Sequence, residues 1–185
     1  MKRTHLARDI AETIALTLLL FLVMHFSVQT YHVESISMQT TLNDQEYVVV
    51  NKIAYLFHAP ERGDIIVFHF PLNTSKDFIK RIIGIPGDVI RTDSTDVWVN
   101  NVKLNEPYIN RTSPTLNPEA RVWTLGKDEY FVMGDNRPSS DDSRSWGVVP
   151  RNYIVGKAVM VYWPLNKWQL LDTYPAVFAQ IKNNS

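Results

Sequence analysis

The chain contains no cysteine, which excludes disulfide bonds, thiolate catalysis and cysteine-ligated zinc. It also lacks an excess of either charge: Lys plus Arg and Asp plus Glu number 19 each, so no basic field for nucleic acid is evident. We therefore expect no nucleic-acid partner and no cofactor. The acidic cluster Asp135, Asp141 and Asp142 could suggest a calcium loop, but it lacks the spaced ligands and closing Glu of an EF-hand. We expect no metal.

Long apolar runs are scarce, and the one that stands out lies near the N-terminus. Residues 10–31 have a dense apolar core from Ile14 to Met24. As a helix, this segment would be about 33 Å long, enough to cross a bilayer core of about 30 Å. The 185-residue chain would then keep roughly 150 residues for one further domain with a sizeable core. The run predicts a transmembrane helix at residues 10–31.

The distribution of positive charge predicts the orientation of this span. Lys2, Arg3 and Arg8 precede it, and the next Lys or Arg is Lys52. The positive-inside bias places residues 1–9 in the cytoplasm and residues 32–185 outside, with the protein in the cell membrane. A cleaved signal peptide has similar regions, but no small-x-small cleavage site follows Val28. A buried core helix is a weaker alternative, because the residues after the span have the pattern of strands.

Beyond the span, apolar segments are short and bounded by Pro, Gly, Asn and Asp, which is typical of strands. These segments are Tyr47–Val50, Ile65–Phe70, Phe78–Ile85, Val97–Val99, Tyr130–Met133 and Val155–Trp163. Asn100-Asn101 indicates a hairpin turn with positive φ, and Tyr174–Ile181 indicates a short helix. Pro114 and Pro118 mark residues 110–120 as a long exposed loop.

These patterns predict a mainly β fold preceded by one N-terminal transmembrane helix. We expect residues 32–185 to form an antiparallel, partly closed β domain that lies outside the cytoplasm. A small inserted hairpin and loop region is expected at about residues 91–128. The oligomeric state is not predicted.

A serine hydroxyl is a poor nucleophile until a base takes its proton, and histidine is the usual base. His5 falls on the predicted cytoplasmic side and His25 in the span. His32, His58 and His69 remain, and none sits in a recognisable triad motif. A Ser-His-Asp catalytic site therefore remains an alternative, but no sequence motif supports it.

Lysine can replace histidine as the base if burial lowers its pKa toward neutrality. Strand alternation places Lys80 on the same face as Phe78 and Ile82. Arg81 faces the other way and stays protonated, so it cannot act as a base. A strand lysine taken alone is more often a solvated surface residue.

The order of five sequence blocks resembles that of the bacterial type I signal peptidases. The apolar span comes first, and the others are Ser37-Met38 with Thr40-Thr41-Leu42, then Arg62–Phe68, Lys80–Asp88, and Gly134–Arg144 followed by Trp146-Gly147. Thr40 departs from the proline of this family, which makes the local turn less rigid but removes no catalytic group. The resemblance covers most of the chain.

The resemblance implies a Ser/Lys dyad in which Ser37 is the nucleophile and Lys80 the general base. Ser35 matches a position where some members carry a hydroxyl, which would stabilise the oxyanion together with the Ser37 N–H; alternatively it is a turn serine. Ser140 matches a serine that bonds to the lysine and orients it. Asp142 and Arg144 match a supporting salt bridge.

The function implied is that of a membrane-anchored serine endopeptidase that removes signal peptides from translocated preproteins. Its partners would be secretory preproteins and the lipid bilayer, and the resemblance implies small substrate side chains one and three positions before the cut. We expect apolar residues near Ser37, including Met38, to line the pockets for these side chains. We also expect an exposed apolar patch around Ser37 and Met38 to lie against the bilayer, because at most about 20 Å of extended chain separates Ser37 from Tyr31, the last residue of the predicted span. The alternatives are a relative dedicated to one substrate, such as a pilin, and a catalytically silent assembly factor.

Overall fold

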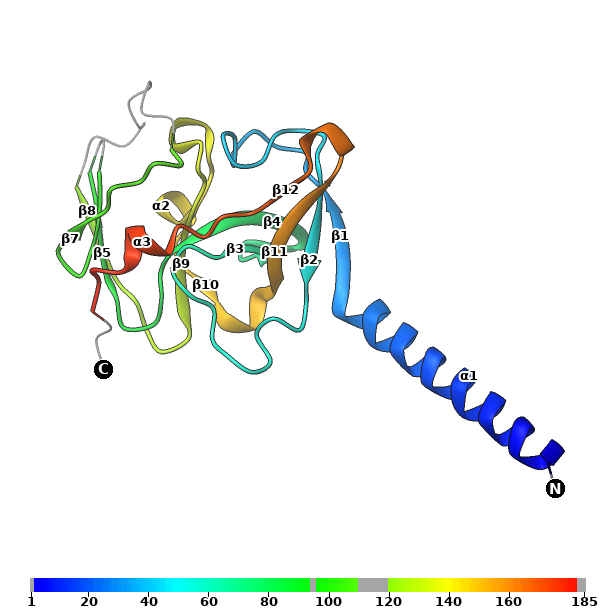
Figure 1. Cartoon of the computed structure of the whole chain (residues 1–185). Helices are drawn as coiled ribbons and strands as arrows, with labels where there is room; N and C mark the ends of the chain where they lie inside the picture. The colour runs from blue at the N-terminus through cyan, green and yellow to red at the C-terminus, as the bar shows by residue number, and fades with distance from the viewer. Residues whose placement is uncertain (1, 94–95, 110–119, 183–185) are drawn as a thin grey trace.

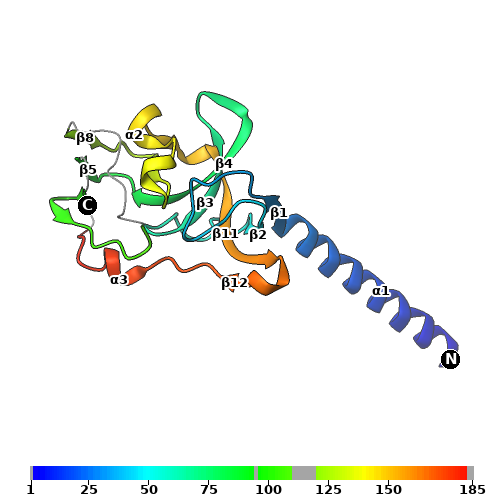
Figure 2. The same ribbon diagram turned by 90° about the horizontal axis from the view of Figure 1, so that it is seen from above.

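The computed structural model describes residues 2–93, 96–109 and 120–182, and it consists of one long helix that projects from a β domain (Figure 1). A second view shows the same separation between the helix and the domain (Figure 2). The loop predicted at residues 110–120 lies outside the described residues except for its last residue.

Helix α1 (Lys2–Ser27) contains the apolar run. Its segment Arg8–Ser27 has a mean hydropathy of 1.9 and is not buried against the domain, so by length and composition it can cross a membrane. The helix ends four residues before the predicted end at residue 31, because Val28–His32 form strand β1. β1 pairs with β2 from Val28↔Asn51 to His32↔Tyr47, and this pairing satisfies the backbone that would otherwise continue the helix.

The β domain contains two antiparallel sheets. The main sheet has the order β1 (Val28–His32), β2 (Tyr47–Asn51), β11 (Ile154–Trp163), β3 (Ile65–Phe70), β4 (Asn73–Gly84), β9 (Glu129–Met133) and β10 (Val149–Pro150), with β12 (Gln169–Leu170) paired to β11. The small sheet has the order β7 (Val102–Lys103), β6 (Val97–Val99), β5 (Val89–Thr92) and β8 (Arg121–Thr124). The prediction of a mainly antiparallel β fold after one helix is confirmed, and within the described residues neither sheet closes into a barrel.

Short helical segments connect the strands. They are η1 (Arg137–Ser139), α2 (Ser143–Trp146), η2 (Arg151–Tyr153), η3 (Leu165–Lys167) and α3 (Pro175–Phe178). Most of the small sheet falls within the region predicted as an insertion, about residues 91–128. Asn100 and Asn101 have φ of 50° and 65° at the β6–β7 turn, as their residue types predict.

Strand β4 is central to the main sheet, since it pairs with β3 on one side and β9 on the other. It begins at Asn73, earlier than the Phe78 predicted from apolar residues, because residues 73–77 form an exposed extension of the hairpin with β3. Its second half is buried, and it carries Lys80 and Arg81 side by side in the sequence. Alternation sends their side chains to opposite faces, so one strand supplies two separate polar sites.

Candidate active site

Ser37 stands at the entrance to a tight turn that follows β1. The next residue, Met38, and Leu42 are both buried in the core of the main sheet, and the Leu42 N–H donates to the Met38 carbonyl at 2.8 Å. The Ser37 carbonyl accepts a hydrogen bond of 3.0 Å from the Asn136 N–H. The backbone on both sides of the hydroxyl is therefore fixed. Met38 is only 1% exposed, so the prediction that it contributes to an exposed apolar patch is wrong, because this side chain is the anchor that holds the turn.

Gly134 allows the segment around residue 136 to approach Ser37 closely. A Cβ at this position would lie 2.4 Å from the Ser37 carbonyl oxygen and 2.3 Å from Ser140 Oγ, distances that real Cβ atoms do not adopt. A side chain here would push the turn at Ser37 away from the segment after β9. The glycine is thus required by the close packing of the Ser37 turn against the segment that begins at residue 134.

Lys80 reaches the serine from the centre of β4. Its Nζ lies 2.6 Å from Ser37 Oγ and 3.0 Å from the Ile79 carbonyl oxygen, and 5.3 Å from the centre of the Phe78 ring. The residue is 4% exposed. Burial lowers the pKa of Lys80 from 10.5 to about 8, although the nearby carboxylates of Asp142 and Asp141 act in the opposite direction. In its neutral form this amine can accept the proton of the Ser37 hydroxyl.

Ser35 lies on the same side of the extended segment as Ser37, as residues two apart do. Its Oγ accepts a hydrogen bond of 3.1 Å from the Ser37 N–H. The two groups expected to bind an oxyanion are therefore neighbours, and in this structure they are bonded to each other. Because the Ser35 oxygen acts as the acceptor, its own O–H proton remains available for a second partner.

Ser140, Asp142 and Arg144 form one bonded cluster, in which Asp142 and Arg144 are buried. The Ser140 hydroxyl donates to Asp142 Oδ2 at 2.7 Å, and Arg144 donates from Nε to Oδ1 and from a terminal nitrogen to Oδ2, both at 2.8 Å. Burial alone would raise the pKa of Asp142, but the bonds from Arg144, the Gly134 N–H and Ser140 hold this pKa below its ordinary value. Asp142 is therefore ionised.

The cluster does not include a direct bond to the lysine. Within the described part of the chain, Ser140 bonds to Asp142 and not to Lys80, whose partners are Ser37 and Ile79. In this structure Ser140 is thus placed to orient Asp142, and a contact with Lys80 would need a rotation of the hydroxyl or a shift of the loop.

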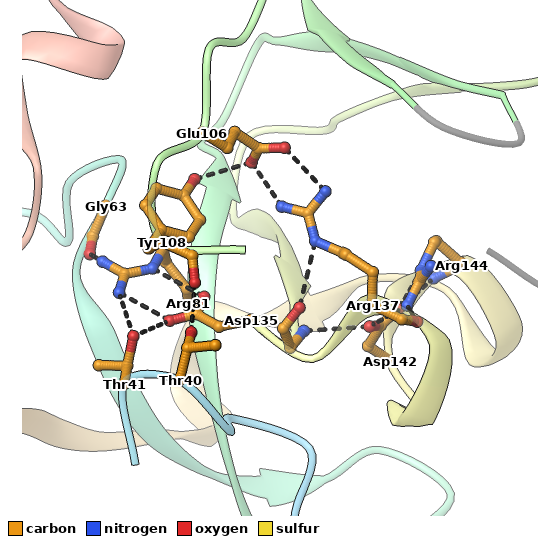
Figure 3. A network of polar contacts seen from close by, with 11 residues as sticks. Thr40, Thr41, Gly63, Arg81, Glu106, Tyr108, Asp135, Arg137, Asp142 and Arg144 are labelled. Atoms are coloured by element: carbon orange, nitrogen blue, oxygen red, sulfur yellow. Dashed lines mark hydrogen bonds and ion pairs between the residues drawn. The ribbon is translucent and has the colours of Figure 1, made fainter. Parts of the chain in front are cut away.

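Two further buried ion pairs surround the site and were missed by sequence reasoning (Figure 3). Arg81 makes two bonds to Asp135, at 2.9 and 2.8 Å, and Thr41 donates to the same carboxylate at 2.5 Å. Arg137 pairs with Glu106, whose carboxylate also accepts from the Tyr108 hydroxyl at 2.7 Å. The only sequence signal was the density of charged residues in 134–144, which does not identify partners that lie 30 or more positions away.

These pairs join the turn after Ser37 to the rest of the domain. The Arg81 guanidinium lies 4.2 Å from the centre of the Tyr108 ring, and the Thr40 hydroxyl donates to the Tyr108 carbonyl. Arg144 donates to the Arg137 carbonyl at 2.7 Å, which connects the two halves of the network (Figure 3). The turn after Ser37 is therefore bonded through Thr40 and Thr41 to a buried scaffold.

A cleft of about 730 Å³ opens in front of Ser37 and Lys80. Its walls come from β1 and the segment after it, from β2, β3 and β4, and from residues near 140. The apolar lining residues are Tyr31, Val33, Val48, Val67, Phe78 and Ile79. The polar lining residues are His32, Glu34, Ser35, Lys76, Asp77, Ser139 and Asp141. Met38 is not among the lining residues, so its predicted role in a pocket is wrong; its side chain packs in the core of the main sheet instead. The cleft thus combines apolar walls with polar groups around Ser37 and Lys80.

The histidines considered as bases have other neighbours. His69 Nδ1 lies 2.7 Å from Asp77 Oδ1, His32 Nδ1 lies 3.3 Å from Glu34, and His58 contacts the Ala59 carbonyl. Within the described residues none of them bonds to Ser37, whose hydroxyl partner is Lys80. The geometry therefore favours the lysine as the base.

Comparison with known proteins gives consistent matches over most of the chain. The family model described as "Signal peptidase, peptidase S26" matches residues 6–163. Signal peptidase IB of Staphylococcus aureus strain Mu50 is 36% identical over 186 residues, covering 91% of this chain and 95% of that protein. Signal peptidase I of Leptolyngbya laminosa is 39% identical over 177 residues, covering 89% and 84%.

A solved structure also matches. It is the crystal structure of a signal peptidase I from Enterococcus faecalis V583, with 32% sequence identity and a TM-score of 0.46. The match covers 53% of this chain and 95% of that chain.

Proposed function

Since the chain belongs to the signal peptidase family, peptidase S26, we propose that it is a membrane-anchored serine endopeptidase that removes N-terminal signal peptides from translocated preproteins. Ser37 is the nucleophile of this reaction and Lys80 is its general base. The observation that supports these roles most strongly is the 2.6 Å contact between Lys80 Nζ and Ser37 Oγ in a buried site.

The first chemical step is attack on the scissile carbonyl. Neutral Lys80 accepts the hydroxyl proton while Ser37 Oγ bonds to the carbonyl carbon, which gives a tetrahedral intermediate with a negatively charged oxygen. Protonated Lys80 then donates to the leaving amine, and the new N-terminus departs. The signal peptide remains as an ester on Ser37, and Lys80 accepts a proton from water in the subsequent hydrolysis.

The negatively charged oxygen of the intermediate needs donors that are already in place. The Ser37 N–H and the Ser35 hydroxyl are the candidates, and they lie within 3.1 Å of each other. When the carbonyl oxygen arrives, the N–H exchanges its bond to Ser35 for a bond to substrate, and the Ser35 O–H adds a second donor. Both groups then act on the same atom.

Ser140, Asp142 and Arg144 have a positioning role in this scheme. Asp142 raises the pKa of Lys80 by its charge, against the larger effect of burial, and Arg144 holds that carboxylate ionised and in place. The balance keeps the amine basic enough to take a proton and still neutral in part near physiological pH. Ser140 fixes the orientation of Asp142 by its 2.7 Å bond.

The cleft is suited to an extended peptide with small apolar side chains. Val33, Val48, Val67 and Ile79 provide apolar walls near Ser37. Family membership adds the expectation of small residues one and three positions before the cut. Substrates of this kind are the ends of signal peptides, which reach the outer face of the membrane next to the anchor.

Helix α1 provides the membrane anchor in this proposal. Its segment Arg8–Ser27 has the length and hydropathy of a span, and the basic residues before it favour a cytoplasmic N-terminus. The catalytic domain then lies outside the cytoplasm, against the membrane into which preproteins are delivered.

Cleavage of a model preprotein by the purified full-length chain in detergent tests this function, with sequencing of the new N-terminus. We expect a single cut after a small residue, and loss of cleavage in Ser37→Ala and in Lys80→Ala with an unchanged fold. Lys103→Ala, which removes an exposed lysine of the small sheet, is the matched control and should keep full activity. Near-normal turnover by Lys80→Ala would contradict the dyad.

The same assay addresses the two alternatives. A catalytically silent homologue would cleave no preprotein at all, although the close contact of Ser37 and Lys80 argues against this. A dedicated peptidase would cleave one substrate, such as a pilin, and leave general preproteins intact.

A further inference from the structure

Asp141 presents an exposed carboxylate to the cleft that holds Ser37 and Lys80. The other two carboxylates that line this cleft, Glu34 and Asp77, each contact a histidine ring, at 3.3 and 2.7 Å. Within the described part of the chain, the Asp141 side chain makes no hydrogen bond or ion pair. Its negative charge is therefore available to a cation that the substrate brings into the cleft.

The backbone on both sides of Asp141 is held in place. The Ser140 hydroxyl donates to the Asp142 carboxylate at 2.7 Å, and this carboxylate also accepts from the Arg144 N–H at 3.2 Å. Asp142 is fully buried and Ser140 bonds to it, whereas Asp141, between them, is exposed. The Asp141 carboxylate thus projects from a bonded support, so that little backbone freedom is lost when it binds a partner.

The proposed reaction determines which part of the substrate lies nearest to Lys80. The carbonyl oxygen turns toward the Ser35 hydroxyl and the Ser37 N–H, and protonated Lys80 must reach the nitrogen of the leaving amine to donate its proton. That nitrogen belongs to the first residue after the cut. The side chain of this residue therefore branches from the carbon atom next to the one that Lys80 protonates.

Asp141 is the carboxylate close to Lys80 that such a side chain can reach. Burial lowers the pKa of Lys80, and the charges of Asp142, Asp141 and Asp135 act against it in decreasing order, so Asp141 lies within electrostatic range of the amine. Asp142 and Asp135 are fully buried, and each is paired with an arginine. Of the three, Asp141 is the one that opens to the cleft.

The other charged lining residues lie farther from the site of proton transfer. Lys76 precedes Lys80 by four residues of β4, which is about 13 Å along a strand. Glu34 lies just after β1, three residues before Ser37. A cationic side chain on the first residue after the cut would thus meet the charge of Asp141 first.

We propose that Asp141 is a specificity-determining residue for the leaving side of the substrate, where it favours Lys or Arg over Asp or Glu as the first residue after the cut. The inference rests on the proposed peptidase function and deepens it, since family membership gives an expectation only for residues before the cut. The ion pair is partly exposed to water, so the preference is modest and weakens as salt is added.

Matched preproteins that differ only in the first residue after the cut test the proposal. The purified full-length chain in detergent is given substrates with Lys, Gln or Glu at this position, and kcat/KM is measured at low and at high salt. Asp141→Asn removes the charge with little change of shape, and Asp141→Lys reverses it. Glu34→Gln, which removes one charge from another wall of the same cleft, is the matched control.

The ratio of kcat/KM for the Lys substrate to that for the Glu substrate isolates the direct contact. Any effect of Asp141 on the basicity of Lys80 is common to all substrates and cancels in this ratio. We expect the ratio to be about five in the unaltered chain at low salt and smaller at high salt. Asp141→Asn should bring it near one, Asp141→Lys should invert it, and Glu34→Gln should leave it unchanged.

Two results would overturn the proposal and leave the peptidase function intact. One is a ratio in Asp141→Asn equal to that of the unaltered chain, whether or not overall activity falls. The other is an equal change of the ratio in Glu34→Gln and Asp141→Asn, which would assign the preference to the total charge of the cleft. Failure of the unaltered chain to cleave any of the three substrates would overturn the peptidase function and the specificity together.

Discussion

At the scale of single residues, the Ser35 hydroxyl accepts a bond from the Ser37 N–H and keeps its own proton free. If that proton stabilises the oxyanion, Ser35→Ala should lower kcat by about 10²–10³ with little change in KM, because the lost interaction exists only in the transition state. Ser35→Thr retains a donor and should keep more activity. Single-turnover kinetics measure both, and an unchanged kcat in folded Ser35→Ala would leave the oxyanion to backbone amides alone.

Thr40 is strained in this structure. Its φ is 92°, a region in which a β-branched residue rarely occurs, and its hydroxyl donates to the Tyr108 carbonyl. Thr40→Ala loses this bond and keeps a Cβ, whereas Thr40→Gly loses the bond but relieves the strain. We expect the glycine variant to be more stable than the alanine variant by roughly 1 kcal/mol, the reverse of the usual order.

Denaturant unfolding of the two full-length Thr40 variants in detergent gives this difference. An alanine variant that is equally or more stable would show that the backbone at residue 40 carries no strain. The family resemblance did not predict the positive φ of Thr40, since the proline found at this position in the family requires a negative φ.

The residue roles that could be predicted were those that belong to short motifs. Ser37, Lys80 and Ser35 could be named because the blocks that contain them are local in sequence, and strand alternation placed Lys80 opposite Arg81. The burial of Met38 could not be predicted, because it depends on the sheet against which the turn packs. The bond from Ser140 to Asp142 depends in the same way on the conformation of its loop.

At the scale of elements, the segment from Gly134 to Arg144 is held by buried charge. Arg144 pairs with fully buried Asp142, and this pair also fixes Ser140 and the Gly134 N–H. Arg144→Met would leave a carboxylate buried without its cation, so we expect a loss of about 3–5 kcal/mol in the free energy of unfolding. The same change should lower kcat, since the segment next to Ser37 loses its support.

Lys103→Met is the matched control for this prediction. Lys103 pairs with Asp96 at 2.7 Å but is about half exposed, so its replacement should change the free energy of unfolding by about 1 kcal/mol or less. Denaturant unfolding compares the two variants directly. Similar small losses in both would mean that the Asp142 carboxylate is solvated or readily protonated in the folded chain.

Strands and helix ends differ in how well the sequence predicts them. The short apolar segments Ile65–Phe70 and Val155–Trp163 predicted strands close to those observed, Ile65–Phe70 and Ile154–Trp163, since such segments reflect burial in the sheet. The end of α1 at Ser27 was missed, because residues 28–31 are compatible with either a helix or a strand. Pairing with β2, a long-range contact, decides between the two.

At the scale of the whole molecule, the helix, the cleft and the buried network have a simple arrangement. α1 leads directly into the edge strand β1, and the segment after β1 carries Ser35 and Ser37. Ser37, the proposed nucleophile, is thus only ten residues beyond the end of the helix at Ser27. Of the apolar surface expected around Ser37 and Met38, Met38 is buried at 1% exposure, whereas Ile36 is 49% exposed.

The pH dependence of kcat/KM for cleavage of a signal-peptide substrate tests the central claim, that buried Lys80 is the base for Ser37. Burial lowers the pKa of Lys80 to about 8, and the amine acts only when it is neutral. We therefore expect kcat/KM to fall about tenfold per pH unit below that value and to level off above it. A profile governed instead by a group near pH 6.5, and lost on replacement of His32, His58 or His69, would contradict the account and assign the base to histidine.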